Sequence, residues 1–163
     1  MKHDAYPPVA ELIPHARRML LLDSVVAHDP DWTTCAVDVD RSELFRDADG
    51  SVPAWVALEY LAQCIAVYGA LVARAKGNRP RFGFFIGGRR IELRVDRFHP
   101  GQQLRATVHH RKGDSGLVAF DGRIEDAAGG EPLVFGRLNV YSVEEPTAAP
   151  GSGRTPRNGR HAA

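Results

Sequence analysis

The chain has 163 residues, 44% of them hydrophobic and 25% charged, which is typical of one globular domain with a full hydrophobic core. Its 21 Lys and Arg residues against 20 Asp and Glu residues give a formal net charge of +1, which offers no overall attraction to nucleic acid or to a membrane surface. The two cysteines, Cys35 and Cys64, lack metal-site spacing, and the N-terminal residues lack the apolar core of a signal peptide. We therefore expect a reduced, cytoplasmic protein without metal or nucleic acid.

Two paired strands are predicted first. Residues 16–29 indicate a turn followed by a strand, because their run of Leu and Val is short and ends in Asp and Pro. Residues 33–41 alternate small or β-branched residues with polar ones, as a half-exposed strand pairing back on the first would do. A polar loop follows over residues 42–51, and Ser51 is the predicted N-cap of a helix.

Residues 52–76 form the most apolar stretch and are predicted to be one helix, roughly 33 Å long at 1.5 Å per residue. The Gly and Pro residues that follow would stop it. A segment of this length could cross a membrane. Because Glu59 and Gln63 lie inside it and no second span follows, we expect no membrane span.

Four further strands are predicted, separated by turn signals at hairpin intervals. They cover residues 81–98, 102–113, 116–127 and 132–143. Two strands, one long helix and a run of antiparallel strands predict an α+β domain, over residues 1–143, in which a curved antiparallel sheet wraps around a central helix. Residues 144–163 are rich in Pro, Gly, Ser and Arg, and we predict a disordered tail.

Three motifs in this order resemble a known family. They are "LIPHARRMLLLD" (Leu12 to Asp23), "VPAWVALEYLAQ" (Val52 to Gln63) and "RFHPGQQL" (Arg97 to Leu104). Their order and spacing are similar to those of the hotdog-fold 3-hydroxyacyl-acyl carrier protein dehydratases over roughly residues 10–143. Within that group the chain looks closest to the dehydratase-like subunits of aryl-polyene-type biosynthesis clusters, which also contain "IPHA" and "VPAW" followed by "EY-x-AQ".

The resemblance implies a hotdog fold and dehydration of a 3-hydroxyacyl thioester to the trans-2-enoyl thioester, in fatty acid or aryl polyene lipid biosynthesis. It implies no cofactor besides the phosphopantetheine arm of acyl carrier protein, which delivers the substrate to a tunnel at a dimer interface. The dimer could be a homodimer or a heterodimer with another hotdog dehydratase. In the family, a histidine and a helix glutamate of the opposite subunit act as base and acid, while helix-start N–H groups polarise the thioester carbonyl.

The motif match places Glu59 at the family's helix carboxylate. The apolar helix is expected to destabilise its charged form, so that it could act as an acid. Gln63, one turn later, could orient Glu59 or contact substrate, and Ala54 could donate its N–H to the thioester carbonyl. The structural alternative is that Glu59 only pairs with an arginine, such as Arg17 or Arg89, across the dimer interface.

The family's loop histidine is absent, because residues 44–55, "LFRDADGSVPAW", contain none. Three replacements for this base remain open. His15 of "IPHA" could take the role, although a lone histidine is more often structural. Asp47 or Asp49 could do so, although their composition is that of an ordinary turn. Finally, the chain could be a catalytically incomplete subunit, and a partner dehydratase could supply its histidine opposite Glu59.

Arg89 and Arg90 are candidates for contact with the acidic carrier protein, against the alternative of an exposed strand with locally balanced charges. His109 and His110 are adjacent on a predicted strand and should point to opposite faces, which does not suit a shared metal. Two rival functions remain: a hotdog thioesterase, which also uses a helix carboxylate, and a non-catalytic acyl-binding subunit.

Overall fold

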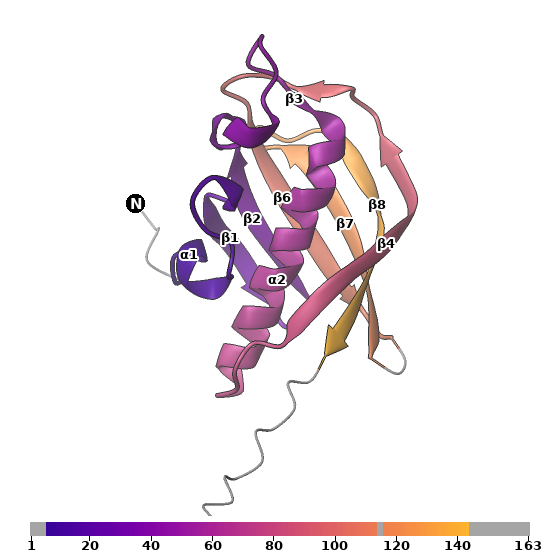
Figure 1. Cartoon of the computed structure of the whole chain (residues 1–163). Helices are drawn as coiled ribbons and strands as arrows, with labels where there is room; N and C mark the ends of the chain where they lie inside the picture. The colour runs from indigo at the N-terminus through magenta and orange to yellow at the C-terminus, as the bar shows by residue number, and fades with distance from the viewer. Residues whose placement is uncertain (1–5, 114–115, 144–163) are drawn as a thin grey trace, which may run out of the picture.

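One curved antiparallel sheet wraps around a long helix in the computed structural model, which describes residues 6–113 and 116–143 (Figure 1). The predicted tail, residues 144–163, lies outside the described residues. The helices, with single 3₁₀ turns labelled η, are α1 (Val9–Leu12), η1 (Arg17–Met19), η2 (Val39–Arg41), η3 (Glu43–Phe45), η4 (Ala54–Val56) and α2 (Ala57–Ala75). The strands are β1 (Ser24–Asp29), β2 (Trp32–Asp38), β3 (Val52–Pro53), β4 (Phe82–Leu93), β5 (Arg97–Phe98), β6 (Gln103–Arg111), β7 (Leu117–Asp126) and β8 (Val134–Val143).

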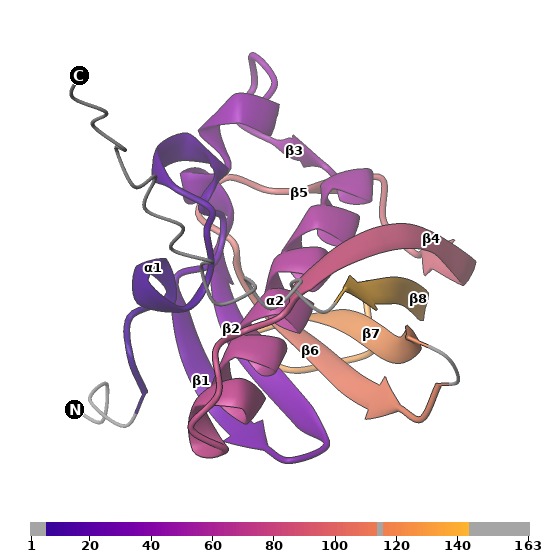
Figure 2. The same cartoon turned by 60° about the horizontal axis from the view of Figure 1, so that its bottom comes forward.

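The large sheet has the strand order β1-β2-β6-β7-β8-β4, and each strand is antiparallel to its neighbours. β1 and β4 are therefore its two edges, and the sheet curves around α2 between them (Figure 2). The predicted α+β class, with a sheet around a central helix, is confirmed. One predicted strand is divided: residues 81–98 form β4 and then β5, and β5 pairs with β3 in a separate two-stranded sheet.

The central helix begins later than the sequence predicts. Val52 and Pro53 pair with β5, so α2 begins at Ala57 after the 3₁₀ turn η4. Ser51 is not the N-cap. Its hydroxyl instead donates to Asp49 Oδ1 at 2.6 Å and accepts from Arg97 Nε at 2.5 Å. The end of α2 at Ala75 agrees with the prediction to within one residue.

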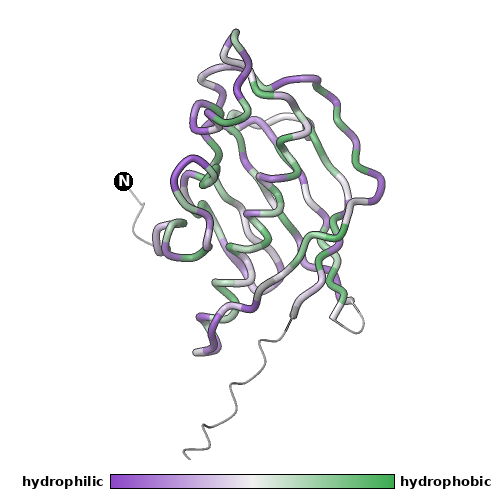
Figure 3. The backbone as a smooth tube through the Cα atoms, in the orientation of Figure 1, coloured by the Kyte–Doolittle hydropathy of each residue, from purple (hydrophilic) through white to green (hydrophobic). Residues whose placement is uncertain are grey.

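The apolar residues of α2 form the centre of the core. Tyr60, Leu61, Cys64 and Val67 are fully buried among side chains of β2, β6, β7 and β8. Hydrophobic residues recur along α2 and along the strands around it (Figure 3). By length and composition the segment Ala54–Ala75, which comprises η4 and α2, could cross a membrane, but 61% of its most apolar window is buried inside the molecule. Its hydrophobicity is therefore explained by the sheet that covers it.

A glycine on β7 permits the close approach of α2 to the sheet. A Cβ atom added to Gly122 would lie 2.8 Å from Leu138 Cδ1 and 3.1 Å from both methyl groups of Leu61. Both neighbours are fully buried and have no free space to move into. Gly122 therefore determines how closely the helix packs on the middle of the sheet.

We expect Gly122→Ala to lower the free energy of unfolding by about 1–3 kcal/mol, because the added methyl group overpacks the core. Gly69→Ala in α2 is the matched control, since no atom lies within 4 Å of its added Cβ. The control should be neutral or should stabilise the protein by up to about 1 kcal/mol through helix propensity. Urea unfolding followed by circular dichroism measures both. Equal midpoints for Gly122→Ala and wild type would contradict the close packing.

Candidate active site

Glu59 and His15 lie next to each other, although they belong to segments that are far apart in the sequence. Glu59 lies in the first turn of α2, and His15 lies between α1 and η1. His15 Nε2 is 3.5 Å from Glu59 Oε1, so the two form an ion pair when the imidazole is protonated. The side chains are 31% and 32% exposed, which leaves both within reach of a ligand. His15 Nδ1 is buried and has no hydrogen-bond partner among the described residues.

Gln63 holds this pair of segments together. Its side chain is fully buried, and its Oε1 accepts a hydrogen bond from the Leu21 N–H at 3.0 Å. Its Nε2 donates to the Met19 carbonyl at 2.7 Å and to Glu59 Oε1 at 2.9 Å. Because Leu21 contributes a donor and Met19 an acceptor, the main chain fixes which end of the amide faces Glu59.

These contacts bear on two expectations for the site. Both N–H groups of Gln63 are used within the chain, so we assign it to positioning Glu59 in place of the predicted contact with substrate. Glu59 was expected in an apolar setting, but its side chain is about one-third exposed within this chain. In the described part of the chain its polar contacts are to His15 and Gln63, and no ion pair joins it to Arg17 or Arg89 of the same chain.

The amide of Ala54 is not free for a substrate carbonyl. The Ala54 N–H donates to the Asp96 carbonyl at 2.9 Å, next to the short pairing of β3 with β5. Ala54 is also only 1% exposed. The expectation that this amide is available was therefore wrong, because the segment before α2 enters a strand pairing that the sequence did not indicate.

The shortened loop uses its carboxylates for its own structure. Asp49 Oδ1 accepts from the Ser51 N–H and hydroxyl at 2.9 and 2.6 Å, and these bonds hold the pKa of Asp49 below its ordinary value. Asp47 forms an ion pair with Arg97. A carboxylate stabilised in its charged form is a weaker base. Both contacts favour a structural role for Asp47 and Asp49 over the alternative that either acts as the base.

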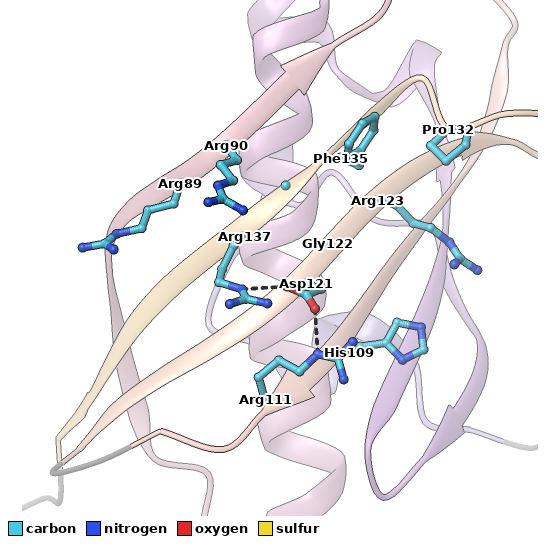
Figure 4. A pocket seen from close by; sticks show the side chains of 11 residues that line it. Arg89, Arg90, His109, Arg111, Asp121, Gly122, Arg123, Pro132, Phe135 and Arg137 are labelled. Atoms are coloured by element: carbon cyan, nitrogen blue, oxygen red, sulfur yellow. Dashed lines mark hydrogen bonds and ion pairs between the residues drawn. The ribbon is translucent and has the colours of Figure 1, made fainter.

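Arg89 and Arg90 belong to a different region of the chain. They line an open hollow on the face of the sheet turned away from α2 (Figure 4), so within one chain they do not join Glu59 and His15. His109 lines the same hollow, whereas His110 stacks on Tyr68 of α2 at 5.7 Å between ring centroids. Among the described residues, no group of three His, Cys, Asp or Glu side chains is placed to hold a metal ion.

Two buried contacts near the site have no signal in the sequence. Tyr60 and Ser42 share a hydrogen bond of 2.6 Å between their hydroxyl groups, and burial raises the pKa of Tyr60 to about 12. Cys64 Sγ lies 3.6 Å from Cys35 Sγ, both thiols are buried, and burial raises the pKa of Cys64. The raised pKa keeps this thiol protonated, which gives it the character of a packing residue.

A sheet wrapped around a helix that carries a partly exposed carboxylate beside a histidine defines a hotdog-fold protein with a candidate acid–base site. The sequence model of the ApeP-like family, described as ApeP dehydratase, matches residues 7–150. The chain therefore belongs to the ApeP-like dehydratase family. A search of curated proteins found no match.

Solved structures agree with this family and fold. "The Dehydratase Heterocomplex ApeI:P from Xenorhabdus doucetiae" contains a chain with 31% sequence identity and a TM-score of 0.78, covering 86% of this chain and 93% of that one. Zebrafish thioesterase superfamily member 2 has 16% identity and a TM-score of 0.59, covering 83% and 91% of the two chains. A hypothetical thioesterase from Streptococcus pneumoniae, solved with coenzyme A, has 7% identity and a TM-score of 0.58, covering 76% and 88%. The two thioesterases show the fold alone.

We expect Gln63→Leu to lower the free energy of unfolding by about 2–4 kcal/mol, because the buried Leu21 N–H and the Met19 carbonyl lose their partner. Glu59→Gln is the matched control: its amide oxygen can still accept from Gln63, and stability should change by less than about 1 kcal/mol. Chemical unfolding monitored by circular dichroism compares the two. If Gln63→Leu were as stable as the control, Gln63 would not hold the segments together.

Proposed function

We propose that the chain dehydrates 3-hydroxyacyl thioesters carried on acyl carrier protein to trans-2-enoyl thioesters. The observation that carries the proposal is the 3.5 Å contact between His15 Nε2 and Glu59 Oε1, which puts a base and an acid together in a chain of the dehydratase family. Elimination of water needs both groups, because a proton leaves C2 while a hydroxyl group leaves C3.

In the proposed reaction, His15 Nε2 removes a proton from C2 of the substrate. The electron pair of that C–H bond forms the C2–C3 double bond as the C3–O bond breaks. Glu59 protonates the departing hydroxyl group, and one water molecule is released. His15 then carries the extra proton, which returns to Glu59 across their 3.5 Å separation before the next turnover.

Polarisation of the thioester carbonyl needs a hydrogen-bond donor near the start of α2. The first amides of a helix have no intrahelical acceptor and lie at the positive end of its dipole. Since the Ala54 N–H is bound to Asp96, we propose the Trp55 N–H, the next amide of η4, for this role. The exposed indole of Trp55 marks this end of α2 as accessible.

We further propose that the site is completed by a second hotdog dehydratase subunit that binds along β4. This strand is an open edge of the sheet, and it exposes Phe84, Phe85 and Ile86 to 63%, 45% and 58%. An exposed, apolar edge strand favours pairing with another chain. The similarity to a chain of a dehydratase heterocomplex supports a heterodimer as the assembly.

We expect Glu59→Gln and His15→Gln each to lower formation of the enoyl product at least about 100-fold, because each removes one proton transfer. The assay incubates a purified 3-hydroxyacyl carrier protein with the chain, alone and with a co-encoded dehydratase, and detects the products by mass spectrometry. His99→Gln, in an exposed turn, is the matched histidine control and should retain full activity.

The products also separate the rival functions. Free acid in place of the enoyl thioester would identify a thioesterase and exclude the proposal. If the lone chain is inactive and the mixture is active, the effect of His15→Gln within the mixture decides the base. Full activity of that mixed variant would show that the partner supplies the histidine and would overturn the role of His15.

We expect Ile86→Lys to weaken dimer formation at least tenfold, because a charge would enter an apolar interface along β4. Val26→Lys is the control, since Val26 is 43% exposed on β1, the opposite edge of the same sheet. Size-exclusion chromatography with light scattering gives the mass of each species over a concentration series. Dissociation caused only by Val26→Lys would place the interface at the other edge.

A further inference from the structure

The hollow on the outer face of the sheet concentrates positive charge. It has a volume of about 700 Å³ and extends over β4, β6, β7 and β8. Its charged and titratable lining residues are Arg89, Arg90, Arg111, Arg123, Arg137, His109 and the single carboxylate Asp121. Figure 4 shows these side chains in front of the sheet, with α2 behind it.

The carboxylate organises part of this cluster. Asp121 on β7 accepts from Arg111 Nε of β6 at 2.6 Å and from Arg137 Nε of β8 at 2.8 Å, and these bonds hold the pKa of Asp121 below its ordinary value. The two arginine side chains remain 57% and 51% exposed. Their remaining N–H groups are therefore fixed in position and accessible, which lowers the entropy lost when an anion binds.

A β-bulge adds two more arginines to the same hollow. Between Arg89 and Glu92, β4 has one residue more than the opposing part of β8, and Arg90 adopts a left-handed backbone conformation with φ of 53°. Adjacent residues of a regular strand point to opposite faces, but here Arg89 and Arg90 both line the hollow. Arg90 points toward Arg137, and Arg89 extends past β4 (Figure 4).

The opposing strand accommodates this bulge with a glycine. A Cβ atom added to Gly136 on β8 would lie 2.8 Å from Ile91 Cα and 2.9 Å from the Arg90 carbonyl oxygen. A left-handed conformation costs an arginine free energy that a glycine would not lose. The left-handed backbone at Arg90 and the glycine at position 136 are both unfavourable within strands, and together they bring Arg90 into the cluster. Such local strain is expected where it serves a function.

The arginines of the bulge differ from the other arginines of the hollow in their ion pairs. Among the described residues, Arg123 pairs with Glu125 at 3.2 Å, whereas no carboxylate forms an ion pair with Arg89 or Arg90. The only carboxylate in the lining, Asp121, is already shared by two other arginines. The cluster therefore keeps a net positive charge that an anionic partner would neutralise.

From this arrangement we propose that the arginine hollow is a docking surface for an acidic protein segment that presents several carboxylates. The four strands span roughly 14 Å at about 4.8 Å per step, so one phosphate group could not contact them all. Guanidinium groups bind carboxylates through paired N–H donors, which matches a partner with spaced Asp or Glu side chains. Base stacking by nucleic acid is disfavoured, since Arg94 lies 4.7 Å above the Phe135 ring.

The hollow is separate from the candidate active site, because it opens on the opposite face of the sheet from α2. The inference therefore does not rest on the proposed dehydration. In the sequence, only the adjacent Arg89 and Arg90 indicate the hollow. Arg111, Arg123 and Arg137 are far from them in the chain and join them only through strand pairing.

The test measures binding of a fluorescein-labelled peptide of eight glutamates to the full chain by fluorescence anisotropy at low salt. The double variant Arg89→Ser/Arg90→Gly removes both free guanidinium groups, and glycine suits the left-handed position of residue 90. We expect its Kd to rise about tenfold with no loss of thermal stability. Arg74→Ala, an exposed arginine at the end of α2, is the control of equal charge type and should bind as wild type.

Competition identifies the ligand class. Two results together support a surface that binds carboxylates. Peptide binding should weaken as the salt concentration rises, and millimolar inorganic phosphate should displace the peptide no better than chloride does at equal ionic strength. Equal affinity of the double variant and wild type would overturn the proposal. Tighter binding of a short DNA duplex than of the peptide would also overturn it. So would a change in the oligomeric state of the double variant that accounts for its loss of peptide binding.

Discussion

The buried amide of Gln63 is the contact on which the candidate site depends. It joins the main chain at Met19 and Leu21 to α2 and donates to Glu59, so one side chain fixes both the N-terminal segment and the carboxylate. His15 lies just before this anchored segment, and its 3.5 Å distance from Glu59 follows from the same attachment. A buried amide is stable only when its polar groups are bonded, which makes the arrangement specific.

The sheet explains why the central helix can be so apolar and still carry polar residues. Its faces pack against β2, β6 and β7, and Gly122 allows the helix to approach closely. The polar residues Glu59 and Gln63 instead face the N-terminal segment, where hydrogen-bonding groups are available. At the opposite edge of the sheet from β1, strand β4 has no neighbour on one side and exposes apolar side chains. Such an edge can pair with a strand of a second chain.

Two groups of charged side chains lie on opposite sides of the sheet. The candidate pair Glu59 and His15 lies on the helix side of the sheet, and the arginine hollow lies on the outer side. Strand alternation produces this separation, since His110 stacks on Tyr68 while its neighbour His109 lines the hollow. The bulge at Arg90 interrupts this alternation, and it increases the charge of the outer face.

The sequence alone determined the α+β class and the central helix, and it marked Glu59 as a candidate site residue, because hydrophobic periodicity and ordered motifs are local signals. It also pointed to His15, but only the tertiary structure placed His15 beside Glu59. Ala54 and Ser51 were misassigned because the pairing of Val52 with Phe98 joins residues far apart in the chain, and no local pattern reports such a pairing. The arginine hollow likewise exists only after four strands align, since register decides which side chains share a face.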